Sequence, residues 1–208
     1  MAKVAADISM SLDGFITGPD DSPEHGLGIG GERLHQWLFD LESWREPHGM
    51  TGGKSGTDAD VLAETFDRAG AIVLGKRMFD FADGWGEEPP FHMPVFVVTH
   101  DAREPLVKQG GTTFAFVNDG IERALDQATA AAGDKDVLVA GGASVIQQVL
   151  RAGRLDEIQI HLVPVLFGAG KRLFDRLDPT QIELETTRVI ASPGVTHLRF
   201  RVAKNQTT

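Results

Sequence analysis

The chain contains a glycine turn of the kind that can hold a phosphate group, at Gly141-Gly142. An apolar run from Val137 to Ala140 precedes the turn and is short enough to be a strand buried on both faces. Apolar residues at helical spacing follow it, from Val145 to Leu150. The first N–H groups of such a helix point at the turn, where the helix dipole also favours negative charge. A plain strand-to-helix connection explains the glycines about equally well, and the turn is not the Gly-x-Gly-x-x-Gly fingerprint of a standard dinucleotide domain.

A second turn repeats the pattern and adds cations. The apolar run Ala71 to Leu74 leads directly into Gly75-Lys76-Arg77-Met78. Two cations in the first turn of a helix oppose its dipole, and a bound anion would reverse that cost. A solvated basic pair is the alternative, because Lys and Arg usually lie on the surface. The placement favours a phosphate site.

Thr99 and His100 are candidates for a third ligand contact. They follow the apolar run Pro94 to Val98, which we interpret as another buried strand. Ligands of open α/β sheets collect beyond the carboxyl ends of the strands.

Two titratable residues are candidates for delivering a proton. His161 lies on a long apolar strand expected from Leu155 to Leu166, and Asp13 lies in the turn Ser11 to Gly14. A hydrogen-bonded interior histidine is at least as good an interpretation of His161 as a substrate contact. Turn chemistry is the simpler interpretation of Asp13.

Composition limits the classes of function that remain. With 208 residues, we expect one domain spanning 1–208. The net charge of -10 argues against a general nucleic-acid binder. The absence of cysteine excludes disulfides, thiolate catalysis and cysteine-based zinc sites, and we predict no metal. There is no apolar stretch long enough to cross a membrane and no signal-peptide pattern, so a cytoplasmic enzyme is expected.

The remaining elements predict an α/β fold. We expect strands at 3–10 and 112–117, and a closing antiparallel hairpin at 182–190 and 195–202. We expect helices at 33–44, at 58–68 with Asp58 as cap, and at 121–132 with Asn118 or Asp119 as cap. The order of elements makes a mixed sheet with helices on its faces, and the tail 204–208 is expected to fray.

Four motifs in chain order carry a resemblance to a known family. The chain resembles the dihydrofolate reductase fold, and more closely the reductase domain of bacterial bifunctional deaminase-reductases of riboflavin synthesis. The resembling segments cover nearly the whole chain: Ser11-Leu-Asp-Gly14, Gly75-Lys-Arg-Met-Phe79, Val139-Ala-Gly-Gly-Ala-Ser-Val145 and Val163-Pro-Val-Leu-Phe-Gly-Ala-Gly-Lys-Arg-Leu-Phe174. The resemblance implies a three-layer αβα architecture with a C-terminal antiparallel hairpin.

The resemblance also implies NADPH as hydride donor and a cofactor site. Phosphate contacts are implied for Gly75, Lys76, Arg77 and Met78, and contacts to the adenosine 2'-phosphate for Thr99 and His100. The pyrophosphate turn, whose Gly-Gly bond is often cis in this fold, corresponds to Gly141, Gly142, Ala143, Ser144 and Val145. Ser9 and Ile16 correspond to positions near the nicotinamide.

The family implies a homodimer joined by the C-terminal hairpin and an activity like that of 5-amino-6-(5-phosphoribosylamino)uracil reductase. The zinc-binding deaminase half has no counterpart here, so we do not expect the bifunctional reaction from this chain alone. Long inserts at 22–31 and 45–57 flank the expected substrate side, where Trp37 and His161 are the candidate contacts. Three hypotheses remain open: a reductase of a small heterocyclic or carbonyl substrate, a catalytically idle NADPH-binding sensor or interaction protein, and a flavin-nucleotide binder.

A true dihydrofolate reductase is an alternative that we expect to fail. Folate enzymes hold the pterin with a carboxylate on the first helix. In the corresponding stretch, Glu32 is the only acid before Asp40, and a favourable first-turn charge explains it better. His161 stands where folate enzymes usually offer Thr, and Trp37 has a ring that can stack on a different flat substrate.

Overall fold

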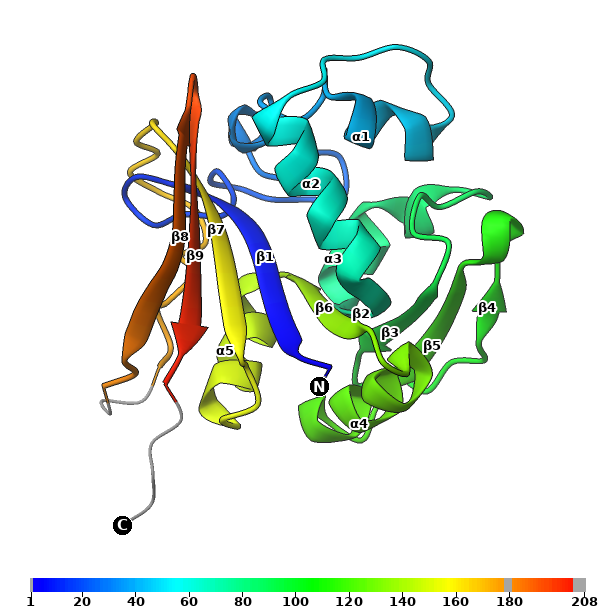
Figure 1. Cartoon of the computed structure of the whole chain (residues 1–208). Helices are drawn as coiled ribbons and strands as arrows, with labels where there is room; N and C mark the ends of the chain where they lie inside the picture. Colours follow the sequence, from blue (N-terminus) through cyan, green and yellow to red (C-terminus); the bar gives the residue numbers. More distant parts are fainter. Residues whose placement is uncertain (1, 178–180, 204–208) are drawn as a thin grey trace.

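The computed structural model describes residues 2–177 and 181–203, so the tail expected to fray lies outside the described residues. Its centre is a nine-stranded sheet with the order β4-β5-β3-β2-β6-β1-β7-β9-β8 (Figure 1). The strands are β1 Val4–Ser11, β2 Ala69–Gly75, β3 Pro94–Val98, β4 Leu106–Val107, β5 Thr113–Val117, β6 Asp136–Gly141, β7 Glu157–Val163, β8 Leu184–Ser192 and β9 Val195–Val202. The short edge strand β4 is the one strand that we did not predict.

Helices connect these strands. The α-helices are α1 Glu42–Arg45, α2 Thr57–Arg68, α3 Lys76–Phe81, α4 Ile121–Ala132 and α5 Ala143–Arg151, and the 3-10 helices are η1 Gly31–Leu34, η2 Glu46–His48, η3 Asp83–Trp85 and η4 Gln109–Gly111. Within the described residues, no helix combines the length and the apolar character needed to cross a membrane.

The direction of the strands decides where a ligand can bind. The central strands β5, β3, β2, β6, β1 and β7 pair in parallel, whereas β4 and the hairpin β8–β9 pair in antiparallel fashion. The predicted mixed sheet with a C-terminal hairpin is therefore confirmed. Because the central strands are parallel, their carboxyl ends meet at one edge of the sheet, which is the upper edge in Figure 1.

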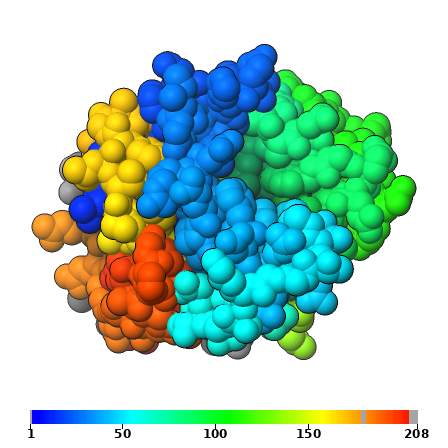
Figure 2. Space-filling view, turned by 90° about the horizontal axis from the view of Figure 1, so that it is seen from above, coloured from blue at the N-terminus to red at the C-terminus, as the bar shows by residue number. Residues whose placement is uncertain are grey.

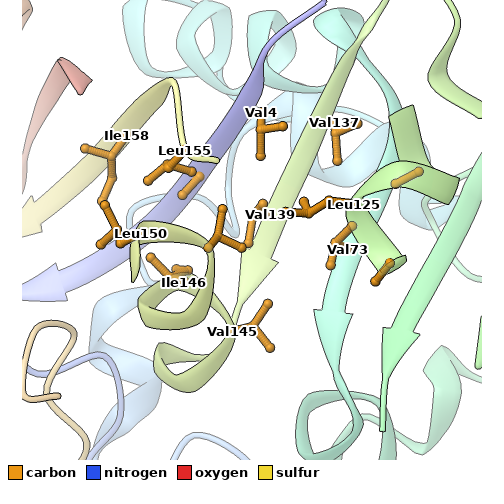
Figure 3. Packing of buried hydrophobic residues seen from close by; sticks show 14 of the residues in the cluster. Val4, Val73, Leu125, Val137, Val139, Val145, Ile146, Leu150, Leu155 and Ile158 are labelled. Atoms are coloured by element: carbon orange, nitrogen blue, oxygen red, sulfur yellow. The ribbon is translucent and has the colours of Figure 1, made fainter. Parts of the chain in front are cut away.

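One face of the sheet packs against α4 and α5 in a continuous apolar core (Figure 3). Leu125 of α4 and Ile146 of α5 are fully buried there, as is Val139 of β6. Burial of side chains of this size typically contributes about 1.5–3 kcal/mol each. The smaller apolar cluster on the opposite face joins Phe79 of α3 to Phe114 and to the alternate residues of β2 and β3. The predicted layers on both faces of the sheet are confirmed.

The remaining part of that opposite face is polar where helix α2 lies. Side chains alternate along β1, β7 and β9, and every second one points into the α4–α5 core. The polar side chains between them point to the opposite face, toward α2: Asp7, Ser9, Gln159, His161, His197 and Arg199. Helix α2 contacts this surface through hydrogen bonds and ion pairs, whereas its apolar residues Ala59 and Leu62 pack on Leu38 and Leu41.

The prediction of one helix over 33–44 is wrong. The segment contains the end of η1, a run of turns and then the single-turn helix α1. Its apolar residues serve two different clusters, since Leu34 packs on Val163 and Val195 while Leu38 packs on α2. Tertiary packing therefore overrides the helical spacing that the sequence shows.

The predicted helix caps are also wrong. Helix α2 is capped at Gly56 (φ 123°), and Asp58 lies in its first turn, where the carboxylate binds His197. Helix α4 is capped at Gly120 (φ 95°), and no side chain of Asn118 or Asp119 caps it. At both places glycine adopts a left-handed backbone conformation at no steric cost, so no polar cap residue is needed to begin the helix.

Candidate functional site at the carboxyl edge of the sheet

The two glycine turns lie side by side. In the parallel pairing of β2 with β6, Leu74 lies opposite Gly141, so Gly75 and Gly142 begin neighbouring connections. A Cβ atom placed on Gly75 would come within 3.0 Å of Val145 Cγ2, and one on Gly141 would come within 3.8 Å of Met78 Sδ. The sheet thus brings together the residues that the sequence assigned to two separate phosphate contacts.

The peptide bond between Gly141 and Gly142 is cis, as the resemblance implies. Gly142 is the residue before α5, and a Cβ atom on it would have no protein atom within 4 Å. The space in front of the first turn of α5 is therefore open, while Ala143 and Val145 behind it are buried. Ser144 is exposed and is held by Gln148 of the same helix, whose Nε2 lies 3.2 Å from the hydroxyl oxygen.

Thr99 and His100 extend this edge on one side and Ser9 on the other. Gly75 pairs with Val98, so Thr99-His100 follows β3 beside the Gly75 turn. Thr99 is buried and its hydroxyl accepts a hydrogen bond from the Asp101 amide at 3.0 Å, whereas His100 is exposed. On the other side of β6, Ser9 of β1 is buried at the carboxyl end of its strand.

The space-filling view looks down on this edge of the molecule (Figure 2). It shows a hollow between the blue N-terminal segment, which includes the insert 22–31, and the green segment that follows α3. The cyan segment that includes the second insert borders the same hollow. Both inserts therefore lie beside the edge where the strand ends meet.

The basic residues of the Gly75 turn have acidic partners in this structure. Lys76 pairs with Asp80 one turn later in α3 and lies 3.8 Å from Asp101. Arg77 donates from Nε to Asp21 Oδ2 at 2.9 Å, and Lys171 contacts the same carboxylate. Burial acts to raise the pKa of Asp21, but the bonds from Lys171 and Arg77 outweigh it and leave that pKa lowered. An incoming phosphate would have to share these cations with carboxylates.

Asp13 organises a loop. Its carboxylate accepts hydrogen bonds from the Ser11 hydroxyl at 2.6 Å and from the amides of Phe167 and Gly168 at 3.1 and 2.8 Å. The Ser11 hydrogen bond, followed by these amides, lowers the pKa of Asp13 to about 2. The carboxylate is ionised at neutral pH and ties the first turn to the segment after β7. Ile16, also a predicted site residue, is buried in the α4–α5 core cluster.

His161 lies in a chain of buried polar groups. Its Nε2 is 2.8 Å from Asp7 Oδ1, and its Nδ1 is 2.6 Å from Nδ1 of His197. His197 Nε2 is in turn 3.0 Å from Asp58 Oδ1. Both ring nitrogens of His161 are thus engaged by protein groups, which favours the interior-histidine interpretation over a ring free to contact substrate.

Trp37 joins this chain to the carboxyl edge. Its indole Nε1 donates to Ser9 Oγ at 3.2 Å, and its ring centroid lies 4.7 Å from that of His161 and 5.1 Å from that of His197. The structure therefore brings together Trp37 and His161, the two residues predicted for the substrate side, next to the Ser9 position.

Sequence reasoning missed the other members of this cluster. Asp7 accepts hydrogen bonds from Thr65 Oγ1 and Gln159 Nε2 in addition to His161, and no motif marks any of them. The alternation of Gln159 and His161 on one face of β7 was visible in the sequence. The partner His197 follows only from the register of β7 with β9, which pairs it opposite His161.

Two buried side-chain atoms in the described part of the chain have no hydrogen-bond partner: His35 Nδ1 and Ser43 Oγ. Burial, with a smaller contribution from the charge of His161, lowers the pKa of His35 to about 4. The ring is therefore neutral at pH 7. Over residues 2–177 and 181–203, no cluster of three or more potential ligands is arranged to hold a metal ion.

The fold is the dihydrofolate reductase architecture. The family model described as the RibD C-terminal domain matches residues 2–198, and the chain belongs to this family of riboflavin-pathway reductases. The uncharacterized protein YyaP of Bacillus subtilis is 25% identical over 210 residues, which cover 95% of this chain and 94% of that protein.

Solved structures show the same fold. A putative riboflavin biosynthesis protein from Shewanella sp. PV-4 superposes with a TM-score of 0.67 at 21% identity, covering 98% of this chain and 99% of that one. Dihydrofolate reductase from Enterococcus faecalis, solved with NADP(H), superposes with a TM-score of 0.55 at 14% identity over 96% of each chain.

Proposed function

We propose that this protein is an NADPH-dependent reductase that transfers hydride to a small heterocyclic substrate, of the pyrimidine or pterin kind, or to a carbonyl compound. The observation that supports this most is the pairing of Leu74 with Gly141, which puts two strand-glycine-helix turns next to each other. A dinucleotide has two linked phosphates and a separate 2'-phosphate, and one edge with several anion-binding elements suits that distribution.

The cofactor contacts are proposed from the resemblance, and the place of most of these residues on the edge supports them. The open space in front of Gly142 and the helix start at Ala143 suit the pyrophosphate, with Gly141, Ser144 and Val145 shaping the turn. Lys76 and Arg77, with Gly75 and Met78, suit phosphate oxygens, and Thr99 with His100 suits the 2'-phosphate beyond β3. Ser9 and Ile16 border the nicotinamide, which supplies the hydride when the cofactor is bound.

On the substrate side, Trp37 offers an aromatic ring next to Ser9. A flat heterocycle can stack on such a ring, and an offset stack typically contributes about 0.5–1.5 kcal/mol beyond burial. Because the ring nitrogens of His161 are both engaged, we assign His161 to holding Trp37 and Asp7 in place. Asp13, predicted as a second proton donor, is assigned to anchoring the loop at Phe167-Gly168.

The test is cofactor binding and turnover by the purified protein. NADPH oxidation is followed with a pyrimidine ribitol-phosphate precursor, dihydrofolate and a panel of small carbonyl compounds. Gly142→Ala gives a matched binding variant, because its new methyl group points into open space where the pyrophosphate is expected. We expect NADPH affinity to fall at least tenfold while the thermal unfolding midpoint stays unchanged.

The outcomes separate the alternatives. Tight NADPH binding without turnover of any substrate would favour the non-catalytic sensor or interaction protein. A flavin absorbance spectrum in the purified protein would favour the flavin-nucleotide binder. Undiminished NADPH binding by Gly142→Ala would contradict the assignment of the pyrophosphate to this turn.

A further inference from the structure

The chain Asp7–His161–His197–Asp58 contains more hydrogen bonds than two neutral histidines can supply. Three contacts join the four groups: Asp7 to His161 Nε2, His161 Nδ1 to His197 Nδ1, and His197 Nε2 to Asp58. Each contact needs one proton, and ionised carboxylates supply none. A neutral imidazole carries a single N–H, so two neutral rings provide two protons for three contacts.

The lack of a proton would be costly at this location. The His161 and His197 side chains are only 2% and 3% exposed, so water cannot compensate for a missing bond. Without the third proton, one contact would bring two lone pairs together, either between the two Nδ1 atoms or between a ring nitrogen and a carboxylate oxygen. An unsatisfied buried polar group costs about 1–3 kcal/mol, and more when a charge is involved.

We infer that His161 and His197 share one additional proton at neutral pH, forming a buried imidazolium–imidazole pair between two carboxylates that holds Trp37 against Ser9. The charge resides on His161, which donates from Nε2 to Asp7 and from Nδ1 to His197. His197 is the neutral ring, which accepts at Nδ1 and donates from Nε2 to Asp58. All three contacts are then satisfied.

The electrostatic surroundings support this assignment. Burial acts to raise the pKa of Asp7, but the charge and hydrogen bond of His161, with Thr65 and Gln159, leave that pKa lowered. Burial lowers the pKa of His197, the hydrogen bond to Asp58 opposes this, and a positive charge on His161 lowers it further. A second charge on the pair, on His197, is therefore opposed.

The groups that face the pair come from every element around it. Asp7 lies on β1, Asp58 on α2, and His35, neutral at pH 7, on the turn after η1. Farther away, Arg199 of β9 donates to Gln159 Oε1 at 2.7 Å and to Glu64 of α2 at 2.6 Å. The nearest charged groups are thus two carboxylates, which favour a single positive charge between them.

Trp37 contacts both members of the pair. A cation within about 6 Å of an indole ring is attracted to its face, and the centroid of His161, the charged ring, lies 4.7 Å from that of Trp37. The neutral His197 ring contacts the indole at 5.1 Å. The same indole donates to Ser9. His197 and Asp58 therefore act as positioning residues for Trp37; only the link from Trp37 to a substrate rests on the proposed function.

Nitrogen NMR of protein labelled with 15N-histidine tests the proton count directly, with no cofactor or substrate added. At neutral pH we expect three of the four ring nitrogens of His161 and His197 to carry a proton. Assignment uses the variants His161→Asn and His197→Asn. Two protonated nitrogens, or four, would overturn the inference.

Asp58→Asn is the decisive variant. The amide of Asn can donate a hydrogen bond to His197 Nε2, which a carboxylate cannot do. Two neutral rings then satisfy all three contacts, so we expect the third proton to be lost. Asp60→Asn is the matched control, because Asp60 lies in the same first turn of α2 but is exposed. We expect it to retain three protonated nitrogens.

A second readout comes from the indole N–H of Trp37, identified by Trp37→Phe. Its resonance should shift with pH as the pair loses its third proton in the wild type and in Asp60→Asn, and that shift should vanish in Asp58→Asn. If Asp58→Asn fails to fold, Asp7→Asn applies the same logic from the other end. Retention of three protonated nitrogens in folded Asp58→Asn or Asp7→Asn would contradict the inference, whatever the reductase assays show.

Discussion

Leu74 lies opposite Gly141 in the parallel pairing of β2 and β6, and this single register brings two strand-glycine-helix turns next to each other. The cations of one turn therefore lie beside the open space in front of the other. The carboxylates of Asp21 and Asp80 pair with those cations.

We predict that NADPH binds well and NADH poorly. A charge-assisted contact to phosphate is worth about 1.5–3 kcal/mol, so its loss weakens binding roughly ten- to a hundredfold. Lys76→Ala and Arg77→Ala should weaken NADPH by this factor in fluorescence titrations. Lys108→Ala, which removes a cation paired with Glu87 elsewhere on the surface, serves as control. Equal affinity of the wild type for both cofactors would refute the prediction.

We expect little or no dihydrofolate reductase activity. Glu32, the one acid in the stretch where a folate enzyme places its carboxylate, is exposed in the first turn of η1. Glu32→Gln should leave NADPH oxidation unchanged with any substrate that the protein reduces. Turnover of dihydrofolate in the ordinary enzyme range of about 1–1000 per second, abolished by Glu32→Gln, would show that the protein is a folate enzyme.

We expect a homodimer joined through the C-terminal hairpin. Strand β8 is an edge strand, and its Val189 and Leu184 are 59% and 42% exposed. Light scattering at micromolar concentration should give twice the monomer mass of 22.5 kDa. Val189→Lys should produce monomers, whereas Val107→Lys, on the edge strand β4 at the other end of the sheet, should not. A wild-type monomer would contradict this expectation.

His35 should make the protein sensitive to acid. Its folded pKa of about 4 lies below the ordinary 6.5, so the unfolded chain takes up the proton first as the pH falls. The stability associated with a neutral His35 is complete above pH 6.5 and is lost between there and about 4, by up to roughly 3 kcal/mol. His35→Gln should remove this part of the pH dependence in urea unfolding. If His35→Gln loses stability between pH 6.5 and 4 as the wild type does, the prediction is wrong.

Asp13 should affect the stability of the protein at lower pH than His35 does. Its pKa is lowered from 3.8 to about 2, so its stabilising effect is complete above pH 3.8 and is lost as the pH falls through about 2. Asp13→Asn should lower the urea midpoint at pH 7, and the difference from the wild type should shrink below pH 3.8. Asp20→Asn, in the exposed loop nearby, is the control and should match the wild type at both pH values.

The sequence predicted the elements whose signals are local. Apolar runs marked β2, β3 and β6, and helical spacing with a glycine end marked α4 from Ile121 to Ala132. The glycine turns were recognised because strand, glycine and helix start follow one another within a few residues. Their convergence, by contrast, depends on the sheet order, which only the resemblance implied.

The histidine pair could not be predicted in the same way. His161 and His197 are 36 residues apart, and their contact depends on the register of a hairpin with a strand at its side. Asp58 looked like a helix cap because aspartate near a helix start usually is one. An aspartate that binds a distant side chain and one that caps its own helix look the same in the local sequence.

The polar contact between α2 and the sheet has a consequence for how the molecule opens. Helix α5 is held by apolar burial on one face, whereas α2 is held on the other face by carboxylates, imidazoles and guanidinium groups. Local unfolding follows the weakest set of contacts, and ionic contacts weaken with salt and acid while apolar ones do not. In amide hydrogen exchange, the amides of α2 should therefore lose protection at low pH before those of α5. Helix α2 and the polar face beneath it would open as a separate unit while the glycine turns keep their shape.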